Sequence, residues 1–175
     1  MDCTACQLHE TRTQIVRGEG ECRKGIMFIG EAPGGDEDLA GRPFVGTAGK
    51  TLRAIISDAG LSESDIRITN ICKCRPPGNR RPKPAEIKAC RQHLFAEIDL
   101  YKPRVIVAVG LTAAQTLLGV KSTMAELIQS DGLSFQGIPV RPVYHTSPLC
   151  INRVPGAREQ IRTCIEKIAR NDFLV

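Results

Sequence analysis

The stretch Val105–Val109, with the sequence VIVAV, is apolar at every position. A strand that is apolar on both faces is typical of a parallel sheet covered by helices on its two sides. The run Ile26–Ile29, which ends at Gly30, has the same character, and Ile66–Cys72 and Pro139–Tyr144 are two further strand candidates. The four runs therefore predict a central, mainly parallel four-stranded sheet.

Stripes of apolar residues at helical spacing separate these strands. One stripe is followed by Gly60, a second begins after Pro84, a third segment runs from Thr112, a possible helix cap, to Gly119, and a fourth lies near the C-terminus. Strands that alternate with helices predict an α/β protein, here a three-layer α/β/α sandwich. A length of 175 residues favours one domain spanning residues 1–175. The stripes comprise Leu52, Ile55, Ile56 and Ala59; Ile87, Cys90, Leu94 and Ile98; and Ile161, Cys164, Ile165 and Ile168.

The composition excludes several classes of protein. No run approaches the ~18 apolar residues of a membrane helix, and the first residues do not resemble a signal peptide. We therefore expect a cytoplasmic protein that does not enter membranes. Eight cysteines in a reducing compartment favour metal binding over disulfides.

Positive charge is concentrated in one segment, residues 71–91. It holds seven Lys and Arg residues and one Glu, a net charge of +6, so the rest of the chain carries 5 − 6 = −1. A local basic patch on a nearly neutral body predicts a polyanion that docks at one place, whereas a solvated loop with incidental charge is the simpler alternative. The charged residues of the segment are Lys73, Arg75, Arg80, Arg81, Lys83, Glu86, Lys88 and Arg91.

Three unusual segments follow the predicted strands. They are Gly30–Asp38, Asn70–Arg81 and His145–Arg153. Ligands of open α/β sheets bind beyond the carboxyl ends of the strands. The sequence therefore predicts a site built from these three segments.

The same segments carry a resemblance to a known family. The motifs are GEAPGGDED from Gly30, GRPFVGTAG from Gly41, TNICKCRPPGNR from Thr69 and HTSPL from His145. In this order and at this spacing they resemble family four of the uracil-DNA glycosylases, the iron–sulfur branch, from Cys3 to about Arg153. The resemblance implies a DNA-repair enzyme that flips uracil out of single- or double-stranded DNA. It would hydrolyse the N-glycosidic bond and leave an abasic site.

Four cysteines are candidate metal ligands. Cys3 and Cys6 form a C-x-x-C pair, and Cys74 and Cys90 flank the basic segment. Spacing alone permits zinc or an iron–sulfur cluster, and Cys72 is a rival ligand. The resemblance implies that Cys3, Cys6, Cys74 and Cys90 hold a [4Fe–4S] cluster with a structural role. The other cysteines, Cys22, Cys72, Cys150 and Cys164, are then assigned to packing.

The resemblance assigns base recognition and catalysis to a few side chains. His145 is expected beside the uracil O2, where a hydrogen bond would stabilise the departing anion. The Asn70 amide would accept from uracil N3–H and donate to O4, a pairing that cytosine cannot match. Phe44 would stack on the flipped base.

The turn after the first strand is expected to supply the remaining pocket residues. Glu31 is the foremost candidate for positioning or activating water, and Glu37 would shape the pocket. Gly30 and Ala32 are expected to line it. Because classical uracil glycosylases have Asp at the position of Ala32, the resemblance leaves the general base open. Asp36 and Asp38 are expected to face solvent or to cap a helix.

DNA contacts are expected from two loops. Arg75, Arg80 and Arg81 would meet phosphates and supply salt-sensitive affinity. Asn79 would shape this loop or touch the sugar–phosphate chain. In the last motif the Ser147 hydroxyl would contact a phosphate, and Leu149 would fill the gap left by the extruded base.

Two absences from the sequence shape the expected reaction. No His lies between Arg75 and Pro84, where one branch of the superfamily traps its product, so ordinary turnover by a monomer is expected. No lysine stands out as a Schiff-base nucleophile, so strand cleavage is not expected.

Thr146 stands where family-four members often have Pro. The alternatives are a non-catalytic module that binds damaged DNA, which would release no base, and an iron–sulfur redox protein.

Overall fold

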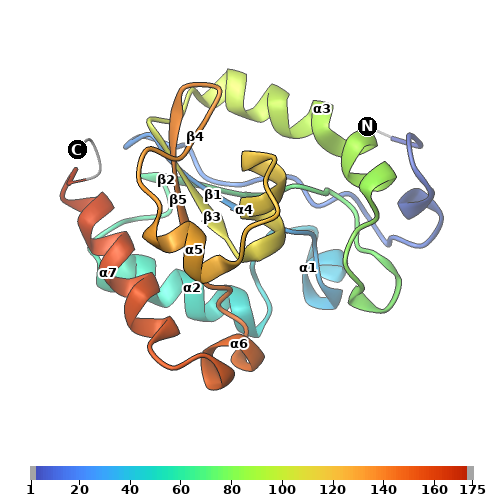
Figure 1. Cartoon of the computed structure of the whole chain (residues 1–175). Helices are drawn as coiled ribbons and strands as arrows, with labels where there is room; N and C mark the ends of the chain where they lie inside the picture. Colours follow the sequence, from blue (N-terminus) through green and yellow to red (C-terminus); the bar gives the residue numbers. More distant parts are fainter. Residues whose placement is uncertain (1–2, 173–175) are drawn as a thin grey trace.

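The computed structural model describes residues 3–172, and a parallel sheet forms its centre (Figure 1). The strand order is β2-β1-β3-β5-β4, in which the first four strands are parallel and β4 runs antiparallel to β5. The strands are β1 (Ile26–Gly30), β2 (Ile66–Asn70), β3 (Val105–Val109), β4 (Ser134–Phe135) and β5 (Ile138–Val143).

Helices cover both faces of this sheet, so the predicted three-layer α/β/α sandwich is confirmed. Figure 1 shows α3 along one side and α2 with α7 along the other. The helices are η1 (Gln7–Glu10), α1 (Gly35–Ala40), α2 (Thr47–Asp58), η2 (Pro77–Asn79), α3 (Pro84–Tyr101), α4 (Leu111–Leu118), α5 (Met124–Gln129), α6 (Pro148–Arg153) and α7 (Ala157–Ala169).

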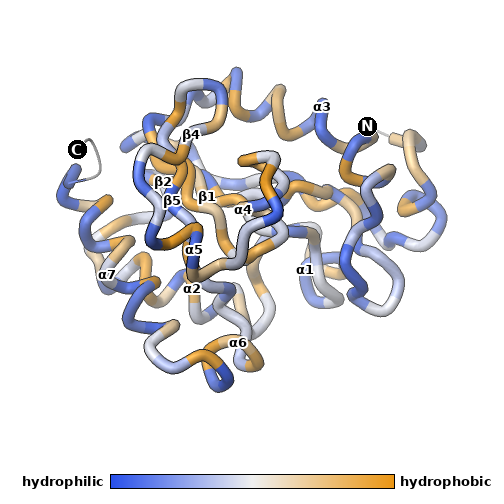
Figure 2. The backbone as a smooth tube through the Cα atoms, viewed as in Figure 1, coloured by the Kyte–Doolittle hydropathy of each residue, from blue (hydrophilic) through white to orange (hydrophobic). Residues whose placement is uncertain are grey.

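The two faces of the sheet pack into two separate cores. Ile26 and Phe28 of β1 point toward α2 and α7, whereas Met27 and Ile29 point toward α3, α4 and α5. Successive strand residues alternate between faces, so a strand buried on both sides is apolar throughout. In Figure 2 the apolar colouring accordingly follows β1 in the middle of the molecule.

The prediction of four strands was wrong by one. The additional strand, β4, has two residues and pairs with the start of β5 across Gln136 and Gly137, which have φ values of 51° and 81°. Two residues are too few to produce a periodic pattern. Thr112 also proved not to be a cap, because α4 begins at Leu111 and Thr112 is buried within it.

The outer edge of β2 is covered by the N-terminal segment. Glu19 and Ile68 form an antiparallel bridge, and the Val16 N–H donates to the Lys73 carbonyl at 2.8 Å. This segment brings Cys3 and Cys6 toward the start of α3 (Figure 1). Within residues 3–172, no helix is long and apolar enough to cross a membrane.

Candidate active site and cysteine pocket

The carboxyl ends of β1, β2 and β5 supply three predicted site residues. Gly30 and Asn70 are paired at the ends of β1 and β2, and His145 lies two residues beyond β5. Gly110, at the end of β3, lies against the imidazole, since a Cβ added there would be 3.2 Å from His145 Cδ2. Gly30, Phe44, Asn70 and His145 thus lie along one edge of the sheet, and this set of residues, the predicted site for a base, is called the base pocket below.

Phe44 and Asn70 converge on Gly30. A Cβ on Gly30 would lie 2.4 Å from Asn70 Oδ1 and 2.5 Å from Phe44 Cζ, so only glycine fits between the two side chains. Asn70 is 3% exposed, yet its amide makes no hydrogen bond within residues 3–172. Among the described residues, the fully buried side-chain polar atom without a partner is Arg67 Nε, so the Asn70 amide is not sealed away from solvent. An amide that has no internal partner and can still be reached is suited to reading a ligand edge.

The backbone of Phe44 is held in a strained conformation. Its φ of 54° is unusual for a bulky residue, and the ring is 6% exposed. The Arg53 guanidinium of α2 donates to the carbonyls of Pro43 and Phe44, each at 3.0 Å. Arg53 also pairs with Glu19 and Glu63. This clamp fixes Phe44, and the sequence analysis did not identify Arg53.

His145 is held in one tautomer. The Ser147 N–H donates to Nδ1 at 3.1 Å, so the ring proton of a neutral imidazole lies on Nε2. Burial lowers the pKa of His145 below its ordinary value, although the Glu31 and Glu37 carboxylates oppose the shift. A neutral Nε2–H donor at this edge can stabilise an oxyanion without prior deprotonation.

The two glutamates of the β1 loop have different surroundings. Glu37 Oε1 accepts from the N–H groups of Val45 and Gly46, and Oε2 accepts from that of Gly34, so its carboxylate ties two loops together. The Glu31 carboxylate makes no hydrogen bond within the described part of the chain, and its charge acts on His145. Ala32 packs beside the core under α3.

Asp38 corrects one expectation. It is 2% exposed rather than solvent-facing, and its carboxylate accepts from the Thr13 N–H at 3.0 Å. The N-terminal segment is thereby attached to α1. The local sequence around Asp38 shows only an acid in a helical turn. Its burial depends on Thr13, which is 25 residues away in the chain.

The basic segment is less exposed than its charge suggested. Lys73 is buried, and Arg80 forms a two-pronged ion pair with Glu86, at 2.8 and 2.6 Å, that holds the pKa of the glutamate below its ordinary value. Arg81 donates to Gln115 from an exposed position. The patch is therefore smaller than predicted, because two of its cations, Lys73 and Arg80, are already paired with carboxylates inside the protein.

Asn79 is exposed at the end of η2 in this loop. With a φ of 56°, it accepts from Arg75 Nε at 2.7 Å through Oδ1. The Arg75 guanidinium in turn lies over Gly35 at the start of α1. Asn79 thus holds the Arg75 side chain within this loop.

The last motif forms the turn into α6. Ser147 caps this helix by accepting from the Cys150 N–H at 3.4 Å, and Leu149 is 62% exposed. Thr146 is fully buried and donates to the Ala48 carbonyl at 2.8 Å. A hydrogen bond to α2 therefore restrains this turn.

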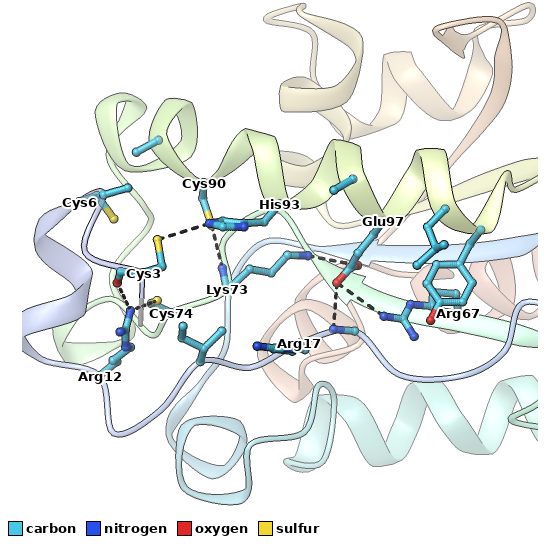
Figure 3. Close-up of a pocket in the computed structure, with 17 residues that line it drawn as sticks. Cys3, Cys6, Arg12, Arg17, Arg67, Lys73, Cys74, Cys90, His93 and Glu97 are labelled. Atoms are coloured by element: carbon cyan, nitrogen blue, oxygen red, sulfur yellow. Dashed lines mark hydrogen bonds and ion pairs between the residues drawn. The ribbon is translucent and has the colours of Figure 1, made fainter. Parts of the chain in front are cut away.

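Four thiols border one cavity of ≈ 500 Å³ beside α3. They are Cys3, Cys6, Cys74 and Cys90, and Figure 3 shows them gathered at one end of the cavity, which is called the cysteine pocket below. Within residues 3–172, no three metal-binding side chains converge as tightly as a single ion requires. Four sulfurs around a common space instead fit a larger group held by four thiolates.

Nitrogen donors surround these sulfurs. Arg12 donates to Cys74 Sγ at 3.2 Å, His93 Nε2 lies 3.3 Å from Cys3 Sγ, and the Lys73 N–H donates to Cys90 Sγ at 3.2 Å. Donors of this kind favour thiolate sulfur and tune a bound centre. Neither Arg12 nor His93 carries a recognisable sequence signal, because both act through distant cysteines.

Cys72 lies outside the cavity lining, in the core. A hydrogen bond from its thiol is the main reason that the pKa of Cys90 falls to about 7, and the same bond together with burial raises the pKa of Cys72. Cys72 is therefore suited to remain a thiol beside a thiolate. Cys22 is buried, and Cys164, on α7, is partly buried against the core, as expected of packing residues.

Comparison with known proteins identifies relatives over most of the chain. The family model of the uracil DNA glycosylase superfamily matches residues 17–169. A type-4 uracil-DNA glycosylase from Saccharolobus solfataricus is 49% identical over 174 residues, which cover 95% of this chain and 80% of that protein. One from Thermotoga maritima is 42% identical over 166 residues, covering 94% and 86%. A type-5 enzyme from Pyrobaculum aerophilum is 30% identical, covering 86% and 65%.

Proposed function

The chain belongs to the uracil-DNA glycosylase superfamily, and on this basis we propose that it is a monofunctional glycosylase that removes uracil from DNA. The observation that carries the proposal is the convergence of an unpartnered Asn70 amide, the Phe44 ring and a neutral His145 at one sheet edge. These groups can bind, stack and polarise a planar base that has a carbonyl–imide edge.

Base recognition rests on Asn70 and Phe44. The Asn70 side-chain oxygen Oδ1 accepts from uracil N3–H and the side-chain NH2 donates to O4, whereas cytosine offers an unprotonated N3 and an amino group there. The Phe44 ring stacks on the base over Gly30. A site built for hydrogen bonds discriminates strongly, because the wrong partner leaves buried polar groups unpaired.

Bond cleavage transfers an electron pair to the base. As the C1′–N1 bond breaks, negative charge develops on the uracil O2 and positive charge on the sugar. His145 Nε2–H donates to this oxygen, and Glu31 orients the water whose oxygen bonds to C1′ and takes one of its protons. The products are uracil and an abasic site. No covalent enzyme intermediate is involved, so strand cleavage does not follow.

DNA is held by the loops around the base pocket. Arg75 and Arg81 pair with phosphates, Arg80 keeps the loop in place through Glu86, and Leu149 inserts into the stack left by the flipped nucleotide. Ser147 contacts a neighbouring phosphate. Glu37, Ala32 and Asn79 shape the walls and the loop rather than the reacting atoms.

Cys3, Cys6, Cys74 and Cys90 are the proposed ligands of a [4Fe–4S] cluster. The donor set is chemically suitable, because four thiols line one cavity and three of them lie beside N–H donors or a histidine ring. The cluster would supply a cross-link between the N-terminal segment and both ends of the basic loop.

We propose that the protein works as a single-domain monomer in the cytoplasm, where its DNA substrate lies.

The decisive experiment compares the wild type with His145→Ala on an oligonucleotide that contains one uracil. Hot alkali reveals abasic sites, and strands with thymine or hypoxanthine in place of uracil are the controls. We expect uracil-dependent cleavage that falls about 100-fold or more in the variant, as for the loss of other oxyanion donors. A folded, brown protein that binds the strand but releases no base would instead be a damage-binding module.

A further inference from the structure

A buried lysine lies between the base pocket and the cysteine pocket. Lys73 is 4% exposed, and its Nζ donates to the backbone carbonyl of Asn70 at 2.8 Å and to Thr69 Oγ1 at 2.6 Å. The backbone N–H of Lys73 donates to Cys90 Sγ at 3.2 Å. One residue therefore contacts both the base-reading strand end and a proposed cluster ligand. Figure 3 shows its contacts with Cys90 and Glu97.

The Asn70 carbonyl needs such a donor. β2 is at the edge of the sheet, with β1 on one side. After Asn70, the N–H groups of Ile71 and Cys72 donate to Gly30 and Glu31, so the chain stays attached to β1 on that side. The Asn70 carbonyl receives its bond from Lys73 alone among the residues described. A buried carbonyl without a partner would be costly, and its peptide would be free to rotate.

The lysine charge is balanced by α3, the helix that carries Cys90. Glu97 Oε2 lies 3.3 Å from Lys73 Nζ, and Oε1 accepts from the Gly18 N–H at 3.2 Å. Arg67 approaches the same carboxylate at 3.6 Å and stacks on the Tyr101 ring at 4.0 Å. Lys73 and Arg67 therefore share one counterion, but only Lys73 reaches Asn70.

We propose that Lys73 is a positioning residue for uracil recognition. By fixing the Asn70 peptide, it sets the direction of the Asn70 side chain and couples the base pocket mechanically to Cys90. This inference rests on the proposed function, because it specifies how that site obtains its selectivity. An ordinary buried lysine would affect stability alone, whereas a positioning lysine also affects affinity for the base.

The test compares Lys73→Met with Arg67→Met. Each variant removes one buried cation from Glu97 and keeps an apolar stem, so the two match in charge and in expected loss of stability. Inhibition by free uracil measures the base contact, and binding to an abasic-site duplex measures the rest of the interface. Iron content and thermal unfolding are measured on the same samples, and assays are run where both variants are folded.

For Lys73→Met we expect the uracil inhibition constant to rise about tenfold, as for a misdirected hydrogen-bonding pair. Affinity for the abasic duplex should stay within about twofold of the wild type, and Arg67→Met should retain normal uracil inhibition. If both variants weaken uracil equally, or neither does, the positioning role is wrong. A wild type that releases no uracil would instead refute the proposed function.

A second variant keeps the inference testable if Lys73→Met does not fold. Thr69→Val preserves side-chain shape and removes one of the three acceptors that hold Nζ, leaving the Asn70 backbone carbonyl and Glu97. It should weaken uracil inhibition by about threefold without changing binding to the abasic duplex. An unchanged inhibition constant in a folded Thr69→Val protein would overturn the role of Lys73.

Discussion

The base pocket and the cysteine pocket lie at the two ends of one short segment, residues 70–74, but they are built in different ways. In the base pocket, backbone and glycine contacts fix the shape, and the Asn70 amide makes no hydrogen bond within residues 3–172. In the cysteine pocket, Arg12 and the Lys73 N–H already donate to sulfur, while the four thiols come from separate segments. The first pocket is therefore preformed, whereas the walls of the second come from separate segments, which the proposed cluster would join.

Removing one proposed ligand should produce the largest effect. Cys74→Ser is expected to abolish visible absorption and to lower the melting temperature by on the order of 10 °C, because the cross-link between three segments is lost. Absorption spectra, iron content and thermal unfolding measure this. Cys164→Ala, on α7, is the control and should remain brown. A colourless wild type with stoichiometric zinc would contradict the iron–sulfur assignment but leave the four ligands in place.

Filling the base pocket should abolish activity while sparing the other pocket. The added methyl of Gly30→Ala would overlap Asn70 Oδ1 and Phe44 Cζ, so uracil release should fall about 100-fold with iron content unchanged. Single-turnover rates and iron analysis give the two numbers. Gly35→Ala is the matched control, since its methyl would make only ordinary contacts, 3.4 Å from Arg75. Equal activity in the two variants would mean that the base binds elsewhere.

The pH dependence should reveal the neutral imidazole. Burial lowers the pKa of His145 from 6.5, and protonation would place a hydrogen on Nδ1 opposite the Ser147 N–H. The neutral, active form therefore persists below pH 6.5, and activity is lost as the pH falls through the lowered pKa, by about tenfold per pH unit. Rates of uracil release measured between about pH 5 and 8 would show this acid limb.

His145→Gln tests the assignment of that limb. The amide cannot titrate, so the residual activity of this variant should be flat over the same range. An acid limb at or above pH 6.5 in the wild type would contradict a buried neutral histidine. A limb that persists in His145→Gln would belong to another group, of which Glu31 is the nearest candidate.

The smallest expected effect concerns Arg81, in the basic loop between Cys74 and α3. Arg81→Ala should reduce the slope of log affinity against log salt by about 0.9 for duplex DNA and about 0.7 for a single strand, because one phosphate contact is lost. Binding titrations at several salt concentrations measure it. Lys167 is an exposed residue on α7, and Lys167→Ala should leave the slope unchanged. Identical slopes for both variants would move the DNA path away from this loop.

Much of the fold could be predicted because its signals are local. Continuous apolar runs identified β1 and β3, and Pro84 marked the first residue of α3. β4 was missed because its two residues are defined only by their partners on β5. Likewise, Gln136 and Gly137 form the turn between these strands, but no apolar run precedes them from which a hairpin could have been predicted.

The site could be predicted less completely, because several of its residues act over long sequence distances. Asn70 and His145 follow strands, and their positions at the sheet edge followed from topology. Lys73 was counted as part of a surface patch, although Glu97, 24 residues away, holds it inside. Arg53 was missed since its role depends on the strained backbone of Phe44, which no residue pattern records.

The position of Tyr101 under Arg67 has a spectroscopic consequence. The protein has no tryptophan and two tyrosines, so its intrinsic ultraviolet emission comes from tyrosine alone. Tyr101 lines the cysteine pocket, and Tyr144 directly precedes His145. Each pocket thus has its own natural fluorophore, and a single Tyr→Phe substitution leaves one optical reporter for DNA binding or for cluster assembly, without any attached dye.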